Sequence, residues 1–283
     1  PQGEALEIFM RIGIVAPACP ITVDDADAVT ALARFSHPQA DLIFADQCFA
    51  IDGHFAGPDG LRRDALVAMA NRADIDAIWF ARGGYGACRI AGEAVAAMEP
   101  TARGKAFLGY SDQGNILAAL YRDGFDHVAH GPLVGDIRRE GGEAAVARAL
   151  DWLVSRSPAL VCASIQPGER AAAFNLMTLS MLLGTPLEPD LAGHVLLVEE
   201  VSEHLYAFDR AMFHVTSVLG PRGLAGLRLG RVTQVPDNDR PFGMEAEDIA
   251  QHWCSVHGIA YLGRADIGHD ADNKIVPFGL HGS

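Results

Sequence analysis

The 283-residue sequence has few of the features that mark disulfide-stabilised or membrane-spanning proteins. Its five cysteines are scattered, odd in number and never spaced as C-x-x-C, so a complete set of disulfides within one chain is impossible. A reducing compartment is the simpler interpretation. No apolar run reaches the ~18 residues that a membrane helix needs, and no signal peptide is visible. We therefore expect a cytoplasmic protein that has no membrane partner.

Positive charge is also scarce, since 22 Lys and Arg residues stand against 36 Asp and Glu residues, which gives a formal charge of −14 at pH 7. This balance argues against binding nucleic acid or an anionic membrane through bulk charge. Nucleotide-binding motifs are missing as well, because no G-K-[ST] occurs and the first apolar strand ends in A-P-A-C-P rather than G-x-G-x-x-G. No H-E-x-x-H or paired Cys/His motif is present. We expect no cofactor and no metal.

Strand-like and helical patterns alternate along roughly the first 150 residues, beginning with R-I-G-I-V-A-P-A. Thr22 and Asp25 have the spacing of a helix cap before the next apolar stripe. The alternation predicts a parallel sheet with helices on both faces, as in Rossmann and flavodoxin-like folds. We predict this α/β domain at 10–155, a linker at 156–173 and a smaller α+β domain at 174–283. Residues 1–9 have no clear place in the pattern.

The unusual residues collect where the predicted strands end, in A-P-A-C-P, A-R-G-G-Y-G, G-Y-S-D and H-G-P. In parallel sheets, ligands bind outside the carboxyl ends of the strands. The glycines of A-R-G-G-Y-G have two interpretations. They either form a tight turn that needs positive φ, or they present backbone N–H groups to an anion or oxyanion.

Ser111 stands at the corner where the apolar strand K-A-F-L-G meets a helical pattern. Serine is a common helix cap, so a structural role competes with that of a nucleophile on a tight turn. The nucleophile elbow of α/β hydrolases reads G-x-S-x-G, whereas the second glycine of G-Y-S-D-Q-G is one place late. The free N–H groups of a helix N-terminus would suit an oxyanion beside Ser111.

Two further candidates lie far along the chain. Glu199 ends the apolar run of H-V-L-L-V-E-E, where a carboxylate needs a partner, either Arg210 or another basic side chain, or a histidine that it orients. His269, in G-H-D-A-D-N, is either a loop residue or a metal ligand beside Asp270 and Asp272. The segment lacks the glycine and the distal glutamate of a calcium loop.

Seven segments, taken in order, resemble the LD-carboxypeptidase family of serine peptidases, which contains the muramoyl-tetrapeptide carboxypeptidases and their microcin-immunity relatives. The segments are I-V-A-P, A-R-G-G-Y-G, L-G-Y-S-D, H-G-P, N-L…L-L-G-T-P, L-V-E-E-V-S-E-H-L-Y-A-F-D-R and G-H-D-A-D-N-K-I-V-P-F-G. Each motif is weak alone, but the ordered set covers nearly the whole chain from Met10.

The resemblance implies a serine–histidine–acid mechanism at the matching positions. Ser111 would be the nucleophile, His269 the general base and then the acid, and Glu199 the carboxylate that orients His269. The backbone N–H groups of Gly84 and Asp112 would form the oxyanion hole. Because Ser111 falls in the first predicted domain and the other two residues in the second, we expect the active site in the cleft between them. The family also implies a homodimer.

Four residues are expected to bind substrate, namely Arg82, Tyr85, His130 and Asn175. His130 lies at a strand–loop junction from which it would line the cleft. Arg82, like Arg210, is a candidate for the terminal carboxylate of the substrate by its charge.

Three departures from the usual spelling of the family bear on substrate preference. Gln113 and Gly114 follow G-Y-S-D, Glu200 stands where an aspartate is usual, and A-F-N-L replaces G-G-N-L. None removes a proposed catalytic group, but Gln113 and Phe174 would alter the pocket if they face the cleft.

The expected activity is hydrolysis of the amide between the L-centre of a diamino acid and the terminal D-alanine of cytoplasmic murein tetrapeptide, which serves cell-wall recycling. An immunity-type peptidase that cleaves a peptidyl or aminoacyl nucleotide amide is the alternative. It shares the triad and differs in a pocket that stacks an aromatic base. A third hypothesis is a non-enzymatic module that binds an anion at Ser111 and Gly84.

Overall fold

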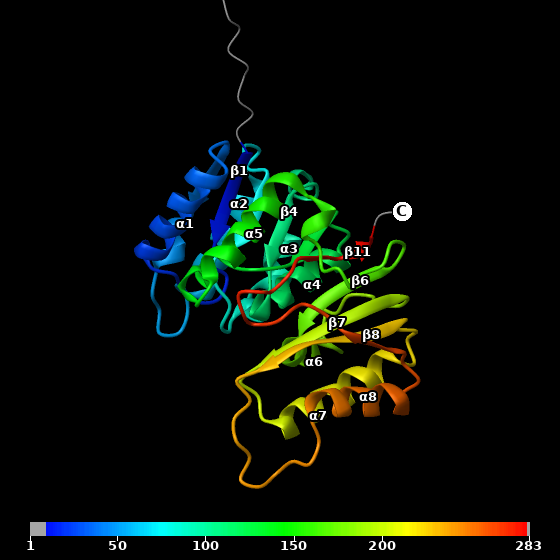
Figure 1. Cartoon of the computed structure of the whole chain (residues 1–283). Helices are drawn as coiled ribbons and strands as arrows, with labels where there is room; N and C mark the ends of the chain where they lie inside the picture. The colour runs from blue at the N-terminus through cyan, green and yellow to red at the C-terminus, as the bar shows by residue number, and fades with distance from the viewer. Residues whose placement is uncertain (1–9, 282–283) are drawn as a thin grey trace, which may run out of the picture.

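The computed structural model of the protein describes residues 10–281, and residues 1–9 and 282–283 lie outside the described part. Two sheets, one of six strands and one of five, organise the chain. Figure 1 shows the first sheet and its helices in the upper part of the molecule, and the second sheet and its helices in the lower part. The predicted α/β class, with a parallel-sheet part followed by a smaller second part, is confirmed.

The first sheet has the strand order of flavodoxin-like folds. In spatial order its strands are β10 (Val276–Pro277), β5 (His127–His130), β4 (Ala106–Gly109), β3 (Ala77–Phe80), β1 (Met10–Val15) and β2 (Ala40–Phe44). All neighbours pair in parallel except β10, which pairs antiparallel with β5. The order reverses between β1 and β3, and ligands bind at such switch points, outside the carboxyl ends of the strands.

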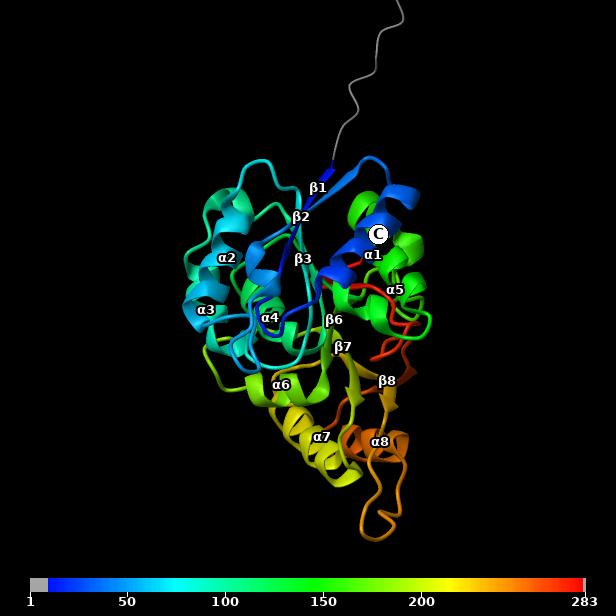
Figure 2. The same cartoon turned by 90° about the vertical axis from the view of Figure 1, so that its left-hand side faces the viewer.

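Helices cover both faces of this sheet (Figure 2). On one face lie α1 (Val23–Ser36) and α5 (Gly142–Ser155), and on the other lie α2 (Asp59–Asn71), α3 (Ala91–Ala96) and α4 (Gly114–Arg122). The cap predicted for α1 is confirmed, because the backbone N–H of Asp25 donates to the Thr22 hydroxyl and that of Thr22 donates to the Asp25 carboxylate.

The second sheet is also mainly parallel. Its strands, in spatial order, are β11 (Gly279–Leu280), β6 (Arg170–Asn175), β7 (His194–Val201), β8 (Gly226–Thr233) and β9 (Tyr261–Arg264). Only β11 pairs antiparallel. The helices α6 (Leu176–Leu182), α7 (Leu205–Leu219) and α8 (Ala246–Val256) pack on one face through an apolar core. Within residues 10–281, no helix combines the length and the apolar character that crossing a bilayer requires.

Short 3₁₀ helices connect these elements. They are η1 (Asp46–Phe49), η2 (Ala87–Arg89), η3 (Pro100–Ala102), η4 (Ser111–Gln113), η5 (Val134–Arg138) and η6 (Pro158–Leu160).

The two sheets are joined more closely than the sequence pattern indicated. β6 begins at Arg170, inside the segment predicted as a linker, because its run of alanines has a weak strand propensity that concealed it. Near the end of the chain β9, β10 and β11 form, and β10 returns to the first sheet. One apolar core also runs from α4 to α6. The domain boundaries themselves stay a prediction.

Candidate active site

Ser111 occupies a strained corner between β4 and α4. After Gly109 ends the strand, Tyr110 is extended, and Ser111 then adopts a φ of +61° at the start of η4. Positive φ is uncommon for residues other than glycine, and backbone strain of this kind clusters at functional sites. The Ser111 side chain caps neither η4 nor α4, so the helix-cap hypothesis is wrong.

The Ser111 hydroxyl instead meets a histidine from the far end of the chain. His269 Nε2 lies 2.9 Å from Ser111 Oγ, and His269 Nδ1 lies 2.5 Å from Glu199 Oε2. Glu199, at the end of β7, is fully buried, and His269 is only 8% exposed. The partner of Glu199 is therefore a histidine and not Arg210, which is exposed and lies over the ring of Tyr206.

His269 reaches Ser111 because its segment crosses from the second sheet to the first. The loop follows β9 and leads into β10, which pairs with β5. Arg139 donates to the carbonyl of His269, and Arg148 of α5 donates to two further carbonyls of the loop at 2.9 Å each. These arginines belong to the first sheet and its helices, so they hold the histidine loop against the strand end that carries Ser111.

The aspartates beside His269 do not form a metal site within residues 10–281, where no group of three His, Cys, Asp or Glu side chains is placed to hold an ion. Asp270 forms an ion pair with Arg231 of β8. Its role is to hold the loop from the side of the second sheet.

His130, expected to bind substrate, lies behind His269. It is 1% exposed, and its Nε2 is 3.0 Å from Asn273 Oδ1, which also accepts the N–H of Gly268 at 3.2 Å. His130 lines neither cavity beside Ser111. This placement favours support of the His269 loop over contact with substrate. Burial lowers the pKa of His130 to about 4.

A buried neutral histidine makes stability depend on pH. As pH falls, the unfolded chain protonates His130 near 6.5, before the folded protein does near 4, so stability that is present above pH 6.5 is lost towards pH 4. Between pH 7 and pH 5 this linkage amounts to about 2 kcal/mol. We expect His130→Gln, which keeps a donor near Asn273, to lose less unfolding free energy over that interval than the wild type. Urea denaturation at both pH values measures the difference, and identical pH dependence would refute the assignment.

The glycine loop after β3 approaches Ser111 closely. A Cβ on Gly83 would lie 2.9 Å from Ser111 Oγ, and Gly84 and Gly86 have φ values of +108° and +127°. The predicted need for positive φ is thus confirmed at two of the three glycines. Among residues 10–281, the N–H groups of Gly84 and Asp112 donate to no backbone or side-chain acceptor. Both are therefore available to an oxyanion.

Two side chains that follow Ser111 fix this loop at its two ends. The Gln113 amide donates to the carbonyl of Arg82 at 2.8 Å, and the Asp112 carboxylate accepts the N–H of Ala87 at 2.8 Å. The buried Arg62 of α2 donates to the carbonyl of Gly86 at 3.0 Å. Burial raises the pKa of Asp112 to about 6. The loop thus has a fixed position relative to Ser111.

The departures at Gln113 and Phe174 do not change the cleft directly. Gln113 is 0% exposed and Phe174 1% exposed, and neither lines a cavity beside Ser111. The departure at Glu200, in contrast, does line a cavity beside Ser111. Burial raises the pKa of Glu200 to about 7, although its carboxylate accepts the Asn175 amide at 2.7 Å and the N–H of Met177 at 2.8 Å.

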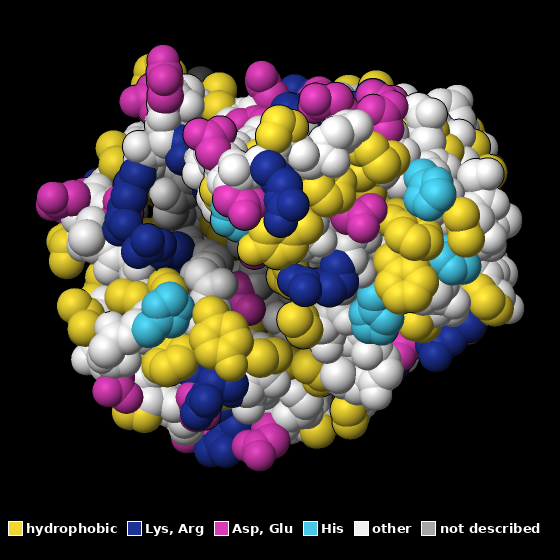
Figure 3. All heavy atoms as spheres, turned by 90° about the horizontal axis from the view of Figure 1, so that it is seen from below, with side chains coloured by type: hydrophobic (Ala, Val, Ile, Leu, Met, Phe, Trp, Pro, Cys, Tyr) yellow, Lys and Arg dark blue, Asp and Glu magenta, His cyan; other side chains and the backbone are white. Residues whose placement is uncertain are grey.

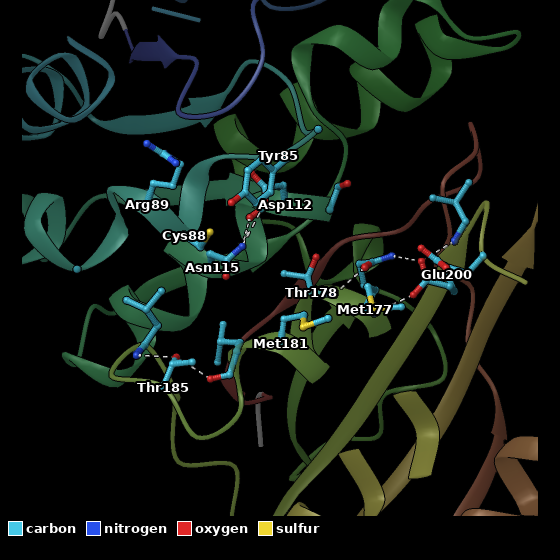
Figure 4. A pocket seen from close by; sticks show the side chains of 18 of the residues that line it. Tyr85, Cys88, Arg89, Asp112, Asn115, Met177, Thr178, Met181, Thr185 and Glu200 are labelled. Carbon is cyan, nitrogen blue, oxygen red and sulfur yellow. Dashed lines mark hydrogen bonds between the residues drawn. The ribbon is translucent and has the colours of Figure 1, made fainter. Parts of the chain in front are cut away.

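A large cavity of about 720 Å³ opens on one side of Ser111. It lies between elements of the two sheets (Figure 4). One wall carries Tyr85, Cys88, Arg89, Asp112 and Asn115, and the opposite wall carries Met177, Thr178, Met181 and Glu200. The predicted residues Tyr85 and Asn175 both line it. Seen from below, the surface of the molecule is hollowed, with Lys and Arg side chains along one rim (Figure 3).

A smaller cavity of about 430 Å³ lies on another side of Ser111. Its lining includes Arg82, Arg138 and Arg139. The two cavities share four residues, which are Gly84, Ser111, Val201 and His269. The serine and histidine therefore stand where the cavities meet, and a peptide that spans both would place a carbonyl group beside Ser111.

Comparisons with known proteins match both parts of the chain. Family models described as the LD-carboxypeptidase N-terminal and C-terminal domains match residues 12–131 and 170–283. The murein tetrapeptide carboxypeptidase of Pseudomonas aeruginosa is 24% identical over 95% of this chain and 91% of its own length. The probable murein peptide carboxypeptidase of Bacillus subtilis is 24% identical over 98% of this chain and 89% of its own.

Solved structures share the fold. A crystal structure of muramoyltetrapeptide carboxypeptidase from Oxalobacter formigenes has a TM-score of 0.77 at 21% identity and covers 95% of this chain and 93% of that one. The structure of MccF in complex with glutamyl sulfamoyl guanosine has a TM-score of 0.76 at 15% identity, with coverage of 96% and 92%.

Proposed function

The chain belongs to the LD-carboxypeptidase family, and on that premise we propose that it is a serine carboxypeptidase that releases the terminal D-alanine of murein tetrapeptide. The observation that carries the proposal is the chain of hydrogen bonds from Ser111 through His269 to Glu199, at 2.9 and 2.5 Å. The relatives named for murein peptides support the substrate.

The proposed first half-reaction forms an acyl-enzyme. Glu199 accepts a hydrogen bond from Nδ1–H of His269, which leaves Nε2 free to take the proton of the Ser111 hydroxyl. Ser111 Oγ then attacks the carbonyl carbon of the diamino acid, and the oxygen becomes an oxyanion. The N–H groups of Gly84 and Asp112 donate to this oxyanion.

Collapse of the tetrahedral intermediate completes the cycle. The C–N bond breaks as His269 gives its proton to the D-alanine nitrogen, and the peptide remains as an ester on Ser111. Water then attacks the ester with His269 again as the base, which releases the shortened peptide and restores the serine. Both half-reactions use the same three side chains and the two backbone N–H groups, and water is the second substrate.

The oxyanion hole gives a prediction with a matched control. Gly84→Ala introduces a Cβ that would lie 2.3 Å from Cys19 Sγ, at a φ of +108° that alanine disfavours, so the Gly84 N–H must move. We expect kcat to fall by about 10²–10³-fold with little change in KM. Gly92→Ala, in the same cavity, places its Cβ 3.6 Å from Leu187 Cδ2 and should keep wild-type kcat. Equal kcat values for the two variants would contradict the role of Gly84.

The remaining assignments are finer proposals. Tyr85 and Asn175 would contact the peptide on the acyl side of the scissile bond, since both line the larger cavity. Cell-wall recycling in the cytoplasm would supply the substrate, and the five free cysteines are compatible with a reducing compartment. We also propose a homodimer, because the family resemblance implies one. A measurement of the molar mass in solution by light scattering tests this proposal.

The alternative is a peptidase of the immunity type, because MccF shares the fold. The volume of the larger cavity, about 720 Å³, and the exposed ring of Tyr85 favour it. Among the described residues, however, no tryptophan lines either cavity. Comparison of kcat/KM for murein tetrapeptide and for an aminoacyl sulfamoyl nucleotide separates the two. We expect the tetrapeptide to be the better substrate, and the reverse order would support the alternative.

A further inference from the structure

The segment A-P-A-C-P, which follows β1, is one of the four unusual strand ends, and its side chains take no part in the proposed chemistry. It is nevertheless held firmly. The backbone of Ala16 exchanges two hydrogen bonds with the buried amide of Gln47, at 2.8 and 3.2 Å, and the buried Arg62 donates to the carbonyl of Pro17. The segment is therefore a rigid support for the backbone that lies against it.

The backbone that lies against this segment is the glycine loop 82–86. The N–H of Cys19 donates to the carbonyl of Gly83 at 3.3 Å. This carbonyl shares a peptide unit with the N–H of Gly84, and in a trans peptide the two groups point in opposite directions. The hydrogen bond from Cys19 therefore directs the Gly84 N–H away from Cys19 and fixes the plane of the peptide that supplies this oxyanion donor.

The thiol of Cys19 packs on the next atom of the loop. Cys19 is only 6% exposed, and its Sγ leaves no room for a Cβ on Gly84. Glycine is the residue with the greatest backbone freedom, and Gly84 has a φ of +108°. Its N–H keeps one direction only if contacts from outside the loop restrain it, and the thiol is such a contact.

His54 holds the thiol in turn. Its Nε2 lies 3.2 Å from Cys19 Sγ. The imidazole packs edge-on against Phe55, with ring centroids 5.3 Å apart, and tilted against Tyr85, at 6.3 Å. His54 is exposed and lines neither cavity beside Ser111. Its contact with Cys19 therefore fixes the position of the thiol without any contact with the cavities.

We propose that Cys19 is a positioning residue of the oxyanion hole, which holds the Gly84 N–H in its direction, and that His54 fixes the thiol in place. The proposal rests on the proposed serine carboxypeptidase function. An oxyanion donor acts mainly in the transition state, where the negative charge develops. A change at Cys19 should therefore lower kcat and leave KM nearly unchanged, whereas a general loss of structure would lower the melting temperature.

Cys19→Ala removes the thiol, and release of D-alanine from murein tetrapeptide measures the effect. The donor is displaced rather than lost, so we expect kcat to fall by about 10- to 100-fold. Cys19→Ser keeps a group that can donate to His54 and should recover most of this loss. Cys254→Ala is the matched control, because it removes another buried thiol, in α8 and away from both cavities, and should keep wild-type kcat.

His54→Ala is an independent test, because truncation of an exposed side chain leaves the core intact. It should lower kcat in the same way as Cys19→Ala. The double variant should be no slower than Cys19→Ala alone, since His54 acts only through the thiol and the two effects are not additive. A double variant slowed by the product of the two single effects would show that His54 does not act through Cys19.

Phosphonylation of Ser111 by a fluorophosphonate separates this proposal from the choice of substrate. The phosphonyl oxygen enters the oxyanion hole, so the second-order rate constant should fall in Cys19→Ala, recover in Cys19→Ser and stay unchanged in Cys254→Ala. Equal rates for Cys19→Ala and Cys254→Ala would overturn the role of Cys19. If Cys19→Ala does not fold, a wild-type rate for His54→Ala would do the same. If the rates follow the expected order but no variant and no wild type releases D-alanine, the carboxypeptidase function is wrong while the positioning role stands.

Discussion

Replacing Ser111 with alanine is expected to abolish D-alanine release, with a fall in kcat on the order of 10⁶-fold. The hydroxyl is the only group on this side chain that can form the ester, and it lies 2.9 Å from His269 Nε2. The cavities and the N–H groups of Gly84 and Asp112 remain, so binding of the shortened product peptide should change little. A coupled assay with D-amino acid oxidase measures release, and calorimetry measures binding.

Ser111→Gly is the matched control for this variant. Alanine at a φ of +61° carries a backbone cost of about 1–2 kcal/mol, whereas glycine does not. Both variants lack the hydroxyl, so both should be inactive if the chemistry requires it. Ser111→Ala combined with His269→Ala should be no worse than either single variant, because the residues act as a unit. Release at the wild-type rate by either Ser111 variant would remove the nucleophile assignment.

Glu199→Gln has the second-largest expected effect, a fall in kcat of about 10⁴-fold. The amide keeps the size of the side chain but can donate to Nδ1 of His269, which favours the tautomer with the proton on Nε2. That tautomer cannot accept the proton of the Ser111 hydroxyl. Because Glu199 is fully buried and its Oε2 lies 2.5 Å from Nδ1, no water can readily take its place.

Glu199→Asp distinguishes the charge from the geometry. It retains the carboxylate but draws it back from His269, so its kcat should lie between those of the wild type and Glu199→Gln. A kcat for Glu199→Gln within tenfold of the wild-type value would show that the carboxylate does not set the tautomer.

The fold was largely predictable because local patterns and tertiary structure agree. Alternating strands and helices leave few arrangements other than a parallel sheet covered on both faces, and the cap at Thr22 has a spacing that is readable from sequence. The predictions that failed concern strands that form only through pairing with distant parts of the chain. The alanine-rich start of β6 acquires strand structure from β7, and β10 is defined only by its partner β5.

The site residues that stand at strand ends and in ordered motifs were predictable from the sequence. The residues that support them were less so. Ser111, Glu199 and His269 were singled out from segments far apart, and the structure brings their side chains together. The supporting residues had no local signal. Arg62 occupies an inward position of α2 because three backbone carbonyls accept its guanidinium, while the apolar Leu61 beside it is 46% exposed.

The position of His130 could not be inferred either, because only the folded protein shows what covers a strand end. Its buried contact with Asn273 depends on the return of the chain to the first sheet at β10.

The most direct test of the central claim is to treat the protein with a fluorophosphonate and locate the adduct by peptide mass spectrometry. The account predicts one adduct, on Ser111, with D-alanine release from murein tetrapeptide lost in proportion to labelling. It also predicts much slower labelling of Glu199→Gln. Undiminished release from fully labelled protein, or a protein that neither reacts at Ser111 nor releases D-alanine, would contradict it.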